Sequence, residues 1–151
     1  MRAFWLLVHY LGFALWLGGG IATMVAGVTA KRWPPDERLA AYRLTSAIQR
    51  ILVGPGAIAV VLSGLVLSIN VMKAMTVPGT LLVMMAVGLL GALIVVGLSV
   101  PTAARLGRLD LDPRGELPET FAALRRRQVW AASLGGGLGL VALVAGAMLR
   151  S

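Results

Sequence analysis

Four long stretches without a formal charge divide the sequence, and they constrain its fold more than any other feature. They run from Ala3 to Ala30, from Ile51 to Met72, from Ala74 to Ala104 and from Gln128 to Leu149. Each is longer than the ~18 apolar residues that mark a helix able to cross the ~30 Å hydrocarbon layer of a membrane. Because lipid offers the backbone no hydrogen-bond partners, a span must be a helix or a barrel strand, and none of these stretches alternates with period two. We therefore expect four membrane-spanning helices.

The composition leads to the same fold class. The chain is 58% hydrophobic and 13% charged, whereas soluble domains are ~45–50% apolar and ~25% charged. So much apolar surface cannot be buried in one small soluble core. The expected fold is all-α: a polytopic membrane protein with a four-transmembrane-helix bundle, and one membrane domain over residues 1–151. We expect helices at about 3–30, 36–72, 77–104 and 119–149, with a kink in the second at Gly54-Pro55-Gly56.

Two simpler interpretations of parts of the chain are excluded. The absence of cysteine rules out disulfides, thiolate metal sites and cysteine nucleophiles. The first apolar stretch follows Arg2 and ends in Val28-Thr29-Ala30, as a cleaved signal peptide does. Its apolar run is, however, far longer than the ~7–15 residues of a signal core, so we expect it to be retained as a helix.

Basic residues are distributed unevenly between the connections. Eleven lie between the first and second or the third and fourth stretches: Lys31, Arg32, Arg38, Arg43, Arg50, Arg105, Arg108, Arg114, Arg125, Arg126 and Arg127. Three lie on the opposite side: Arg2, Lys73 and Arg150. The positive-inside rule then predicts both termini outside and the two basic loops cytoplasmic, in a bacterial-type inner membrane. The net charge of +8 is explained by this orientation and by anionic lipids at those loops, not by nucleic acid.

Small residues predict how the helices pack. Ala14, Gly18, Ala22, Ala26 and Ala30 recur every four residues in the first helix, and such small-residue lines let membrane helices approach closely. Further small residues occur in the third and fourth helices: Gly88, Gly91, Ala92, Ala131, Gly135, Gly139 and Ala142. Packing within the bundle is the favoured use, and a flat cofactor or a partner subunit remains an alternative.

A weak internal repeat points to duplication of a helical hairpin. At an offset of 83 residues, Pro35 matches Pro118, and Gly54 and Gly56 match Gly137 and Gly139.

His9 is the candidate functional residue. It is the only histidine, and Trp5, Phe13 and Trp16 share its helical face. At ~1.5 Å per residue it lies roughly 9 Å below the expected outer end of its helix. A polar ring at that depth calls for a functional hypothesis. The alternative is that its imidazole hydrogen-bonds a neighbouring carbonyl group.

Methionines gather at the same expected level. Six of the seven fall in the outer half: Met1, Met72, Met75, Met84, Met85 and Met148. Imidazole suits iron and copper, and thioether suits Cu(I) or a haem axial position. We therefore expect haem b or copper, with His9, Met84 and Met85 as candidate metal ligands. Lys73 or Arg2 would pair with haem propionates. The alternative is that the methionines fill the core.

The first helix also resembles a known family. The segment from His9 through Trp16 to Gly18 and Gly19 resembles the first helix of CopD-like copper-resistance membrane proteins. It is also similar to related uncharacterised four-helix families and, more distantly, to haem-binding membrane protoporphyrinogen oxidases. Gly64-Leu-Val-Leu-Ser68 and Pro78-Gly79 are compatible with later parts of the pattern.

The resemblance implies a four-helix unit with a haem or copper site, in which His9 is a ligand and Trp16 lies beside the cofactor. The haem-binding relatives carry a further histidine or lysine ligand, and no second histidine exists here. His/Met, His/Lys, five-coordinate and partner-shared sites remain open.

Three functions follow from these patterns. The first is redox or metal handling at an outer haem or copper site. The second is a non-catalytic accessory subunit of a larger membrane complex. As partners we expect further copies of the chain or partner membrane subunits. The third, an enzyme such as a protoporphyrinogen oxidase, is disfavoured because acid–base chemistry needs paired groups. The acidic residues among the arginines of 105–118 are interpreted as a solvated loop.

Overall fold

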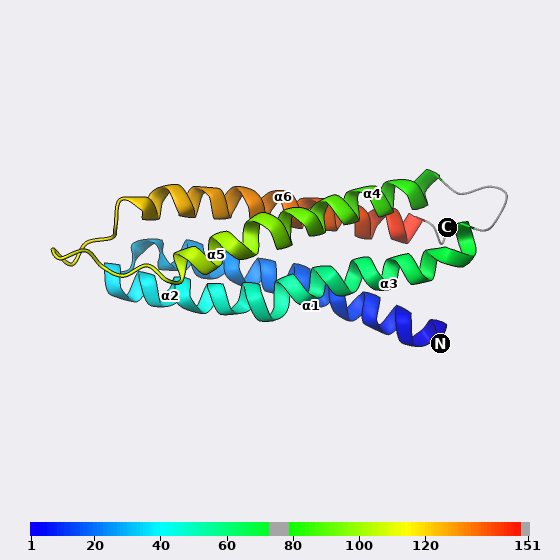
Figure 1. Cartoon of the computed structure of the whole chain (residues 1–151), viewed down its shortest axis with the longest axis horizontal. Helices are drawn as coiled ribbons and strands as arrows, with labels where there is room; N and C mark the ends of the chain where they lie inside the picture. The colour runs from blue at the N-terminus through cyan, green and yellow to red at the C-terminus, as the bar shows by residue number, and fades with distance from the viewer. Residues whose placement is uncertain (73–78, 149–151) are drawn as a thin grey trace.

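The molecule is an elongated bundle of four helical rods that run antiparallel to their chain neighbours (Figure 1). The computed structural model describes residues 1–72 and 79–148, with side chains for 1–69 and 79–148. Within these ranges four helices are long and apolar enough to span a membrane: Arg2–Arg32, Pro35–Ile69, Gly79–Leu106 and Thr120–Met148. The prediction of an all-helical chain with four such helices is confirmed.

Three of the four rods combine α-helix with another helix type. The first rod is α1 (Arg2–Thr29) with a short 3₁₀ turn, η1 (Ala30–Arg32). The second joins α2 (Pro35–Ile48), a π-helical segment η2 (Gln49–Val53) and α3 (Gly54–Met72). The third joins α4 (Gly79–Ile94), a second π-helical segment η3 (Val95–Ser99) and α5 (Val100–Leu106). The fourth is α6 (Thr120–Met148).

The kink expected at Gly54-Pro55-Gly56 stays a prediction; the structure has the π-helical segment η2 directly before these residues. The chain stays helical, and η2 bonds the Gly54 N–H to the Gln49 carbonyl, five residues back. Proline has no N–H and its ring crowds the carbonyl four residues before it. A widened turn ahead of Pro55 therefore accommodates the ring. The same arrangement recurs in η3, which is followed by Pro101 and bonds the Val100 N–H to Val95.

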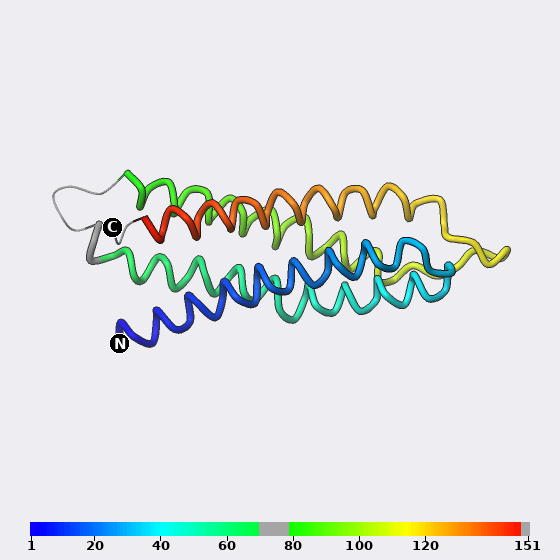
Figure 2. The backbone as a smooth tube through the Cα atoms, turned by 180° about the vertical axis from the view of Figure 1, so that it is seen from behind, coloured from blue at the N-terminus to red at the C-terminus, as the bar shows by residue number. Residues whose placement is uncertain are grey.

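Each hairpin packs first on itself. The α1–α3 and α4–α6 contacts are the most extensive, and smaller contacts join α3 to α4, α1 to α6 and α2 to α5. The end of the bundle where α1 begins and α6 ends is called the terminal end below. Figure 2 shows that the connection between α5 and α6 projects beyond the opposite end.

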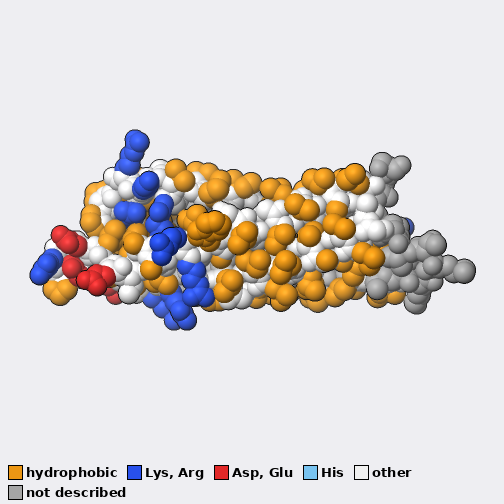
Figure 3. All heavy atoms as spheres, turned by 90° about the horizontal axis from the view of Figure 1, so that it is seen from above, with side chains coloured by type: hydrophobic (Ala, Val, Ile, Leu, Met, Phe, Trp, Pro, Cys, Tyr) orange, Lys and Arg blue, Asp and Glu red, His pale blue; other side chains and the backbone are white. Residues whose placement is uncertain are grey.

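That opposite end carries the positive charge and is called the arginine end below. In Figure 3, lysine and arginine side chains gather there, while hydrophobic side chains cover the rest of the visible body. A small second core underlies this end, formed by Leu39, Tyr42, Leu106 and Phe121. Arg38 lies 4.9 Å over the Phe121 ring, and Arg125 donates a 2.9 Å hydrogen bond to the Tyr42 hydroxyl.

The small-residue line expected to pack α1 into the bundle is wrong for most of its length. Ala14, Gly18 and Ala22 are exposed, and only Ala30 is fully buried. A step of four residues turns an α-helix by about 40° beyond a full turn, so the four steps from Ala14 to Ala30 drift off any one face. The face that does pack contains Gly12, Trp16, Gly19 and Thr23 instead.

The small residues of the third and fourth rods were predicted correctly. Gly88, Gly91, Ala92, Ala131, Gly135, Gly139 and Ala142 are all buried. The duplicated-hairpin hypothesis stays a prediction: Gly56 and Gly139 both pack against Trp16, but Gly54 is buried where Gly137 is exposed.

Candidate functional site

The imidazole of His9 is held against α3 by two hydrogen bonds. Its Nδ1 lies 3.1 Å from the Val60 carbonyl oxygen and 2.9 Å from the Ser63 hydroxyl. A carbonyl oxygen only accepts, so Nδ1 carries the proton. The Ser63 hydroxyl itself donates to the Ala59 carbonyl and accepts from His9. In the neutral ring the lone pair is therefore on Nε2.

Packing fixes the plane of the ring. Phe13 meets it edge to face at 5.2 Å between centroids. On the α3 side, ring atom Cε1 lies 3.2 Å from where a Cβ on Gly64 would be, so the glycine leaves the space that the imidazole occupies. Within the described part of the chain, Nε2 has no hydrogen-bond partner. A histidine whose Nδ1–H bonds a backbone carbonyl and whose Nε2 stays available is the usual form of a histidine metal ligand. The same bond also satisfies the alternative expected from the sequence, a histidine bonded to a neighbouring carbonyl.

Beneath His9, the indole of Trp16 fills the centre of the bundle. It is 1% exposed and stacks on Phe13 at 6.0 Å. Its Cη2 and Cζ2 atoms each lie 3.2 Å from where a Cβ would stand on Gly91 and Gly139, and a Cβ on Gly56 would lie 2.8 Å from its backbone nitrogen. Gly91 and Gly139, on two rods, thus leave the space that the indole fills, and Gly56 lets the backbones of α1 and α3 approach closely. The Trp16 Nε1–H has no acceptor among the described residues.

Register places a second layer above this one. It lies seven residues, or about two turns and ~10 Å, nearer the terminal end. At this step Trp16 corresponds to His9, Gly56 to Ser63, Gly91 to Met84 and Gly139 to Gly146. His9 bonds Ser63, and the Met84 sulfur lies 3.0 Å from where a Cβ on Gly146 would be. These four residues are called the His9 layer below.

The other residues expected at the site are more dispersed. Met85 is partly buried, and Arg2 is exposed. Lys73 and Met75 lie outside the described residues, as does the side chain of Met72. Over the described ranges, no cluster of three or more His, Cys, Asp or Glu residues is arranged to hold a metal ion.

A buried chain of neutral polar side chains crosses all four rods, and sequence reasoning missed it. Its members are Thr23, Gln49, Ser99 and Gln128, called the polar belt below. Gln128 Nε2 donates to the Ser99 hydroxyl at 2.9 Å. Ser99 donates to Gln49 Oε1 at 3.4 Å, and Gln49 Nε2 donates to Thr23 at 3.2 Å.

The belt ends on Thr23, which donates to the Gly20 carbonyl at 2.9 Å. All four side chains are less than a tenth exposed. Gln128 Oε1 is buried with no partner in the described part of the chain, so the belt can accept one more hydrogen bond. Two glutamines at the edges of apolar stretches were the only sequence signal.

The acidic residues beyond α5 support the loop itself. Asp112 accepts the backbone N–H groups of Arg114 and Glu116 at 2.9 and 2.7 Å, and Gly115 closes this turn with φ of 76°. Asp110 forms an exposed 2.7 Å ion pair with Arg43. These contacts agree with the interpretation of a solvated loop.

Comparison with known proteins adds no relative: no family model, curated protein or solved structure matches this chain. The likeness of the first helix to CopD-like proteins therefore stays a prediction from its residues.

Proposed function

We propose that this protein is a small integral membrane protein that binds copper or haem b at His9, near the outer face, and handles metal or electrons there. The observation that carries the proposal is the His9 geometry: Nδ1 is held on the Val60 carbonyl, and Nε2 has no hydrogen-bond partner among the described residues. This hydrogen bond fixes the tautomer and the ring plane before any metal arrives, which lowers the cost of ordering a ligand.

The arrangement of charge supports the orientation. The basic residues gather at the arginine end (Figure 3), and the positive-inside rule makes that end cytoplasmic in a bacterial-type inner membrane. The His9 layer then lies in the outer half, with both termini outside.

Of the two cofactors, copper fits the packing better. A porphyrin needs a flat cavity, and the glycine-lined space at the bundle centre is filled by Trp16. Cu(I) is compact and prefers imidazole and thioether ligands, and Met84 shares the His9 layer. Bound there, copper would be cargo or would supply one-electron chemistry. His9 and Met84 would hold it, and a third ligand would come from Met85 or a partner.

The test is a metal and spectral analysis of the purified full chain, in detergent and loaded with Cu(I) under reducing conditions. We expect about one copper per chain and no Soret band. His9→Gln should lose the copper, and Met84→Leu should weaken its binding. Met24→Leu removes a methionine that is exposed elsewhere on α1 and should bind copper as the wild type does.

Three outcomes decide this proposal. A Soret band that disappears in His9→Gln would replace copper by haem b at the same residue. Wild-type protein with neither copper nor haem would overturn the cofactor proposal. Equal copper in the wild type and a folded His9→Gln variant would overturn the ligand assignment.

A second function, a non-catalytic accessory subunit, is favoured by open glycines on the bundle surface. Around Gly97, Gly136 and Gly137, no described atom of another element lies within 4 Å of where a Cβ would be, and glycine faces let a partner helix approach closely in lipid. Blue-native electrophoresis of mild-detergent extracts tests it. Co-migration with a larger complex that Gly137→Leu abolishes would support it, whereas a homo-oligomer that is stable and cofactor-loaded on its own would count against it.

A further inference from the structure

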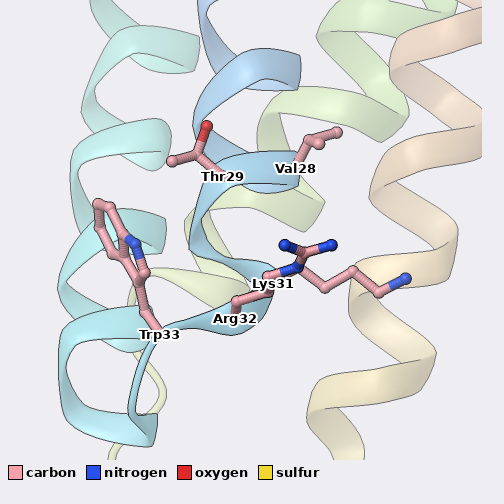
Figure 4. Close-up of a pocket in the computed structure, with 5 residues that line it drawn as sticks. All are labelled: Val28, Thr29, Lys31, Arg32 and Trp33. Atoms are coloured by element: carbon pink, nitrogen blue, oxygen red, sulfur yellow. The ribbon is translucent and has the colours of Figure 1, made fainter.

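A hollow lies where the first rod ends, at the arginine end. It has a volume of about 670 Å³ and is lined by Val28, Thr29, Lys31, Arg32 and Trp33 (Figure 4). The chain leaves the helix here because η1 ends at Arg32 and Trp33 takes an extended conformation. In Figure 4 the Lys31 and Arg32 side chains project to one side of this turn, and the Trp33 indole stands on the other side and points back towards Thr29.

The hollow carries uncompensated positive charge. None of its lining residues is acidic. The ion pair present in the described ranges, Arg43 with Asp110, involves neither Lys31 nor Arg32. Lysine and arginine together suit a phosphate group, arginine through paired N–H donors and lysine as a point charge.

An apolar track leads from the hollow along the outer face of α1. Gly18, Ala22, Val25 and Thr29 follow one another at steps of four, three and four residues, so they share one helical face. Ala22 and Val25 are exposed, and no atom lies within 4 Å of where a Cβ on Gly18 would be. Gly18 and Ala22 belong to the line of small residues that does not pack into the bundle.

The track has the length of a single lipid leaflet. From Gly18 to Thr29 is eleven residues, or about 16 Å at 1.5 Å per residue, and half of a ~30 Å hydrocarbon layer is ~15 Å. At its charged end stands Trp33, and tryptophan prefers the level of the lipid headgroups. The hollow and the track together thus have the dimensions and the polarity of one phospholipid.

We propose that this face of α1 binds a phospholipid with an anionic headgroup. The phosphate lies between Lys31 and Arg32, the Trp33 indole stands across the turn at the level of the headgroup, and one acyl chain follows the track over Val25 and Ala22 to Gly18. The proposal depends neither on a cofactor at His9 nor on which end of the bundle is cytoplasmic. A soluble phosphate shares the headgroup chemistry but has no use for the track.

The test measures lipid binding to the full chain in a neutral detergent, by native mass spectrometry and by the shift in unfolding temperature. The probes are phosphatidylglycerol, phosphatidylcholine and inorganic phosphate. We expect one tightly retained phosphatidylglycerol and little effect of the other two. The double variant Lys31→Gln/Arg32→Gln should weaken phosphatidylglycerol binding ten- to thirtyfold, because each basic residue near a membrane surface contributes roughly a fivefold factor.

The matched control is Arg126→Gln/Arg127→Gln. It removes the same charge from exposed positions at the same end, outside the hollow, and should bind as the wild type does. A further variant, Gly18→Leu/Ala22→Leu, fills the track and should weaken phosphatidylglycerol without changing the response to phosphate. Equal losses in the two arginine-end variants would overturn the proposal, since they would show attraction to net charge alone. A phosphate response equal to that of phosphatidylglycerol would overturn the assignment to a lipid.

Discussion

The His9 layer and the polar belt occupy the same bundle interior, on opposite sides of Trp16, and they are built differently. Among the residues that the structure describes, the hydrogen bonds of His9 join α1 to α3 through Nδ1, and none is made by Nε2. In the polar belt, hydroxyl and amide groups from four rods bond one another in sequence. One layer holds a reactive group in an otherwise apolar setting, and the other joins the helices without charge.

The two regions therefore use their polar groups for different purposes. A cross-bundle chain of neutral hydrogen bonds aligns all four helices, because a shift of any one of them would leave a buried amide or hydroxyl unpaired. The His9 layer makes no such demand on α4 or α6, so a ligand there need not disturb the register of the bundle. The Trp16 layer keeps the two regions apart.

The largest loss of stability is expected from a change beside Trp16, which separates the His9 layer from the polar belt. In Gly56→Ala, the new methyl group would lie 2.8 Å from the Gly12 carbonyl oxygen and from the Trp16 backbone nitrogen. Since neither is a flexible side chain, α1 and α3 must separate, and we expect a loss of about 3 kcal/mol in the free energy of unfolding. Denaturant titration followed by circular dichroism measures it.

The control is Gly137→Ala, which has open space around the new methyl. It should be neutral or stabilising by up to about 1 kcal/mol, because alanine favours helix over glycine. A tolerated Gly56→Ala would mean that the two layers are not held apart as described.

Gln49→Leu should cause the next largest loss of stability, because Gln49 lies in the middle of the polar belt. It leaves Thr23 and Ser99 each without one partner, and we expect a loss of about 1–2 kcal/mol. Gln128→Met removes a group that already has one unsatisfied atom, so it should cost less. If the order of the two is reversed in the same titration, the belt is not a chain that depends on its central member.

Ser63→Ala tests the His9 layer through its affinity for metal instead of through the free energy of unfolding. The change removes one of the two acceptors that hold Nδ1, and loss of such a support typically lowers metal affinity about tenfold or more. We expect about a tenfold loss of Cu(I) affinity in a competition titration. Ser68→Ala, which removes a buried serine bonded to the Gly64 carbonyl, should leave the affinity unchanged. Equal affinities for the two variants would contradict a supporting role for Ser63.

The smallest effect is expected at the surface of the arginine end. Arg43→Gln breaks the ion pair with Asp110, whose partners are 56% and 81% exposed. Exposed pairs contribute little, so the unfolding free energy should change by less than about 0.5 kcal/mol. A larger loss would show that this end, and not the belt, aligns the helices.

Several features could be predicted from the residues because they depend on the chain alone. Charge-free stretches of sufficient length predicted the four long helices, and the clustering of arginines predicted one strongly basic end. His9 was singled out because a lone imidazole in such a stretch has few simple explanations. The hydrogen-bond partners of His9 could not be predicted, since Val60 and Ser63 lie more than fifty residues away in the sequence.

The number of rods, their approximate limits and the segregation of charge could be inferred from the residues alone, because each follows from hydrogen bonding and polarity along one helix. Only the tertiary structure decided which face of each rod turns inward. The stretches are apolar on every side, so periodicity carries no direction, and the line from Ala14 to Ala26 was placed on the wrong face. Close packing around Trp16 and the pairing of buried amides made that choice, and both require all four helices at once.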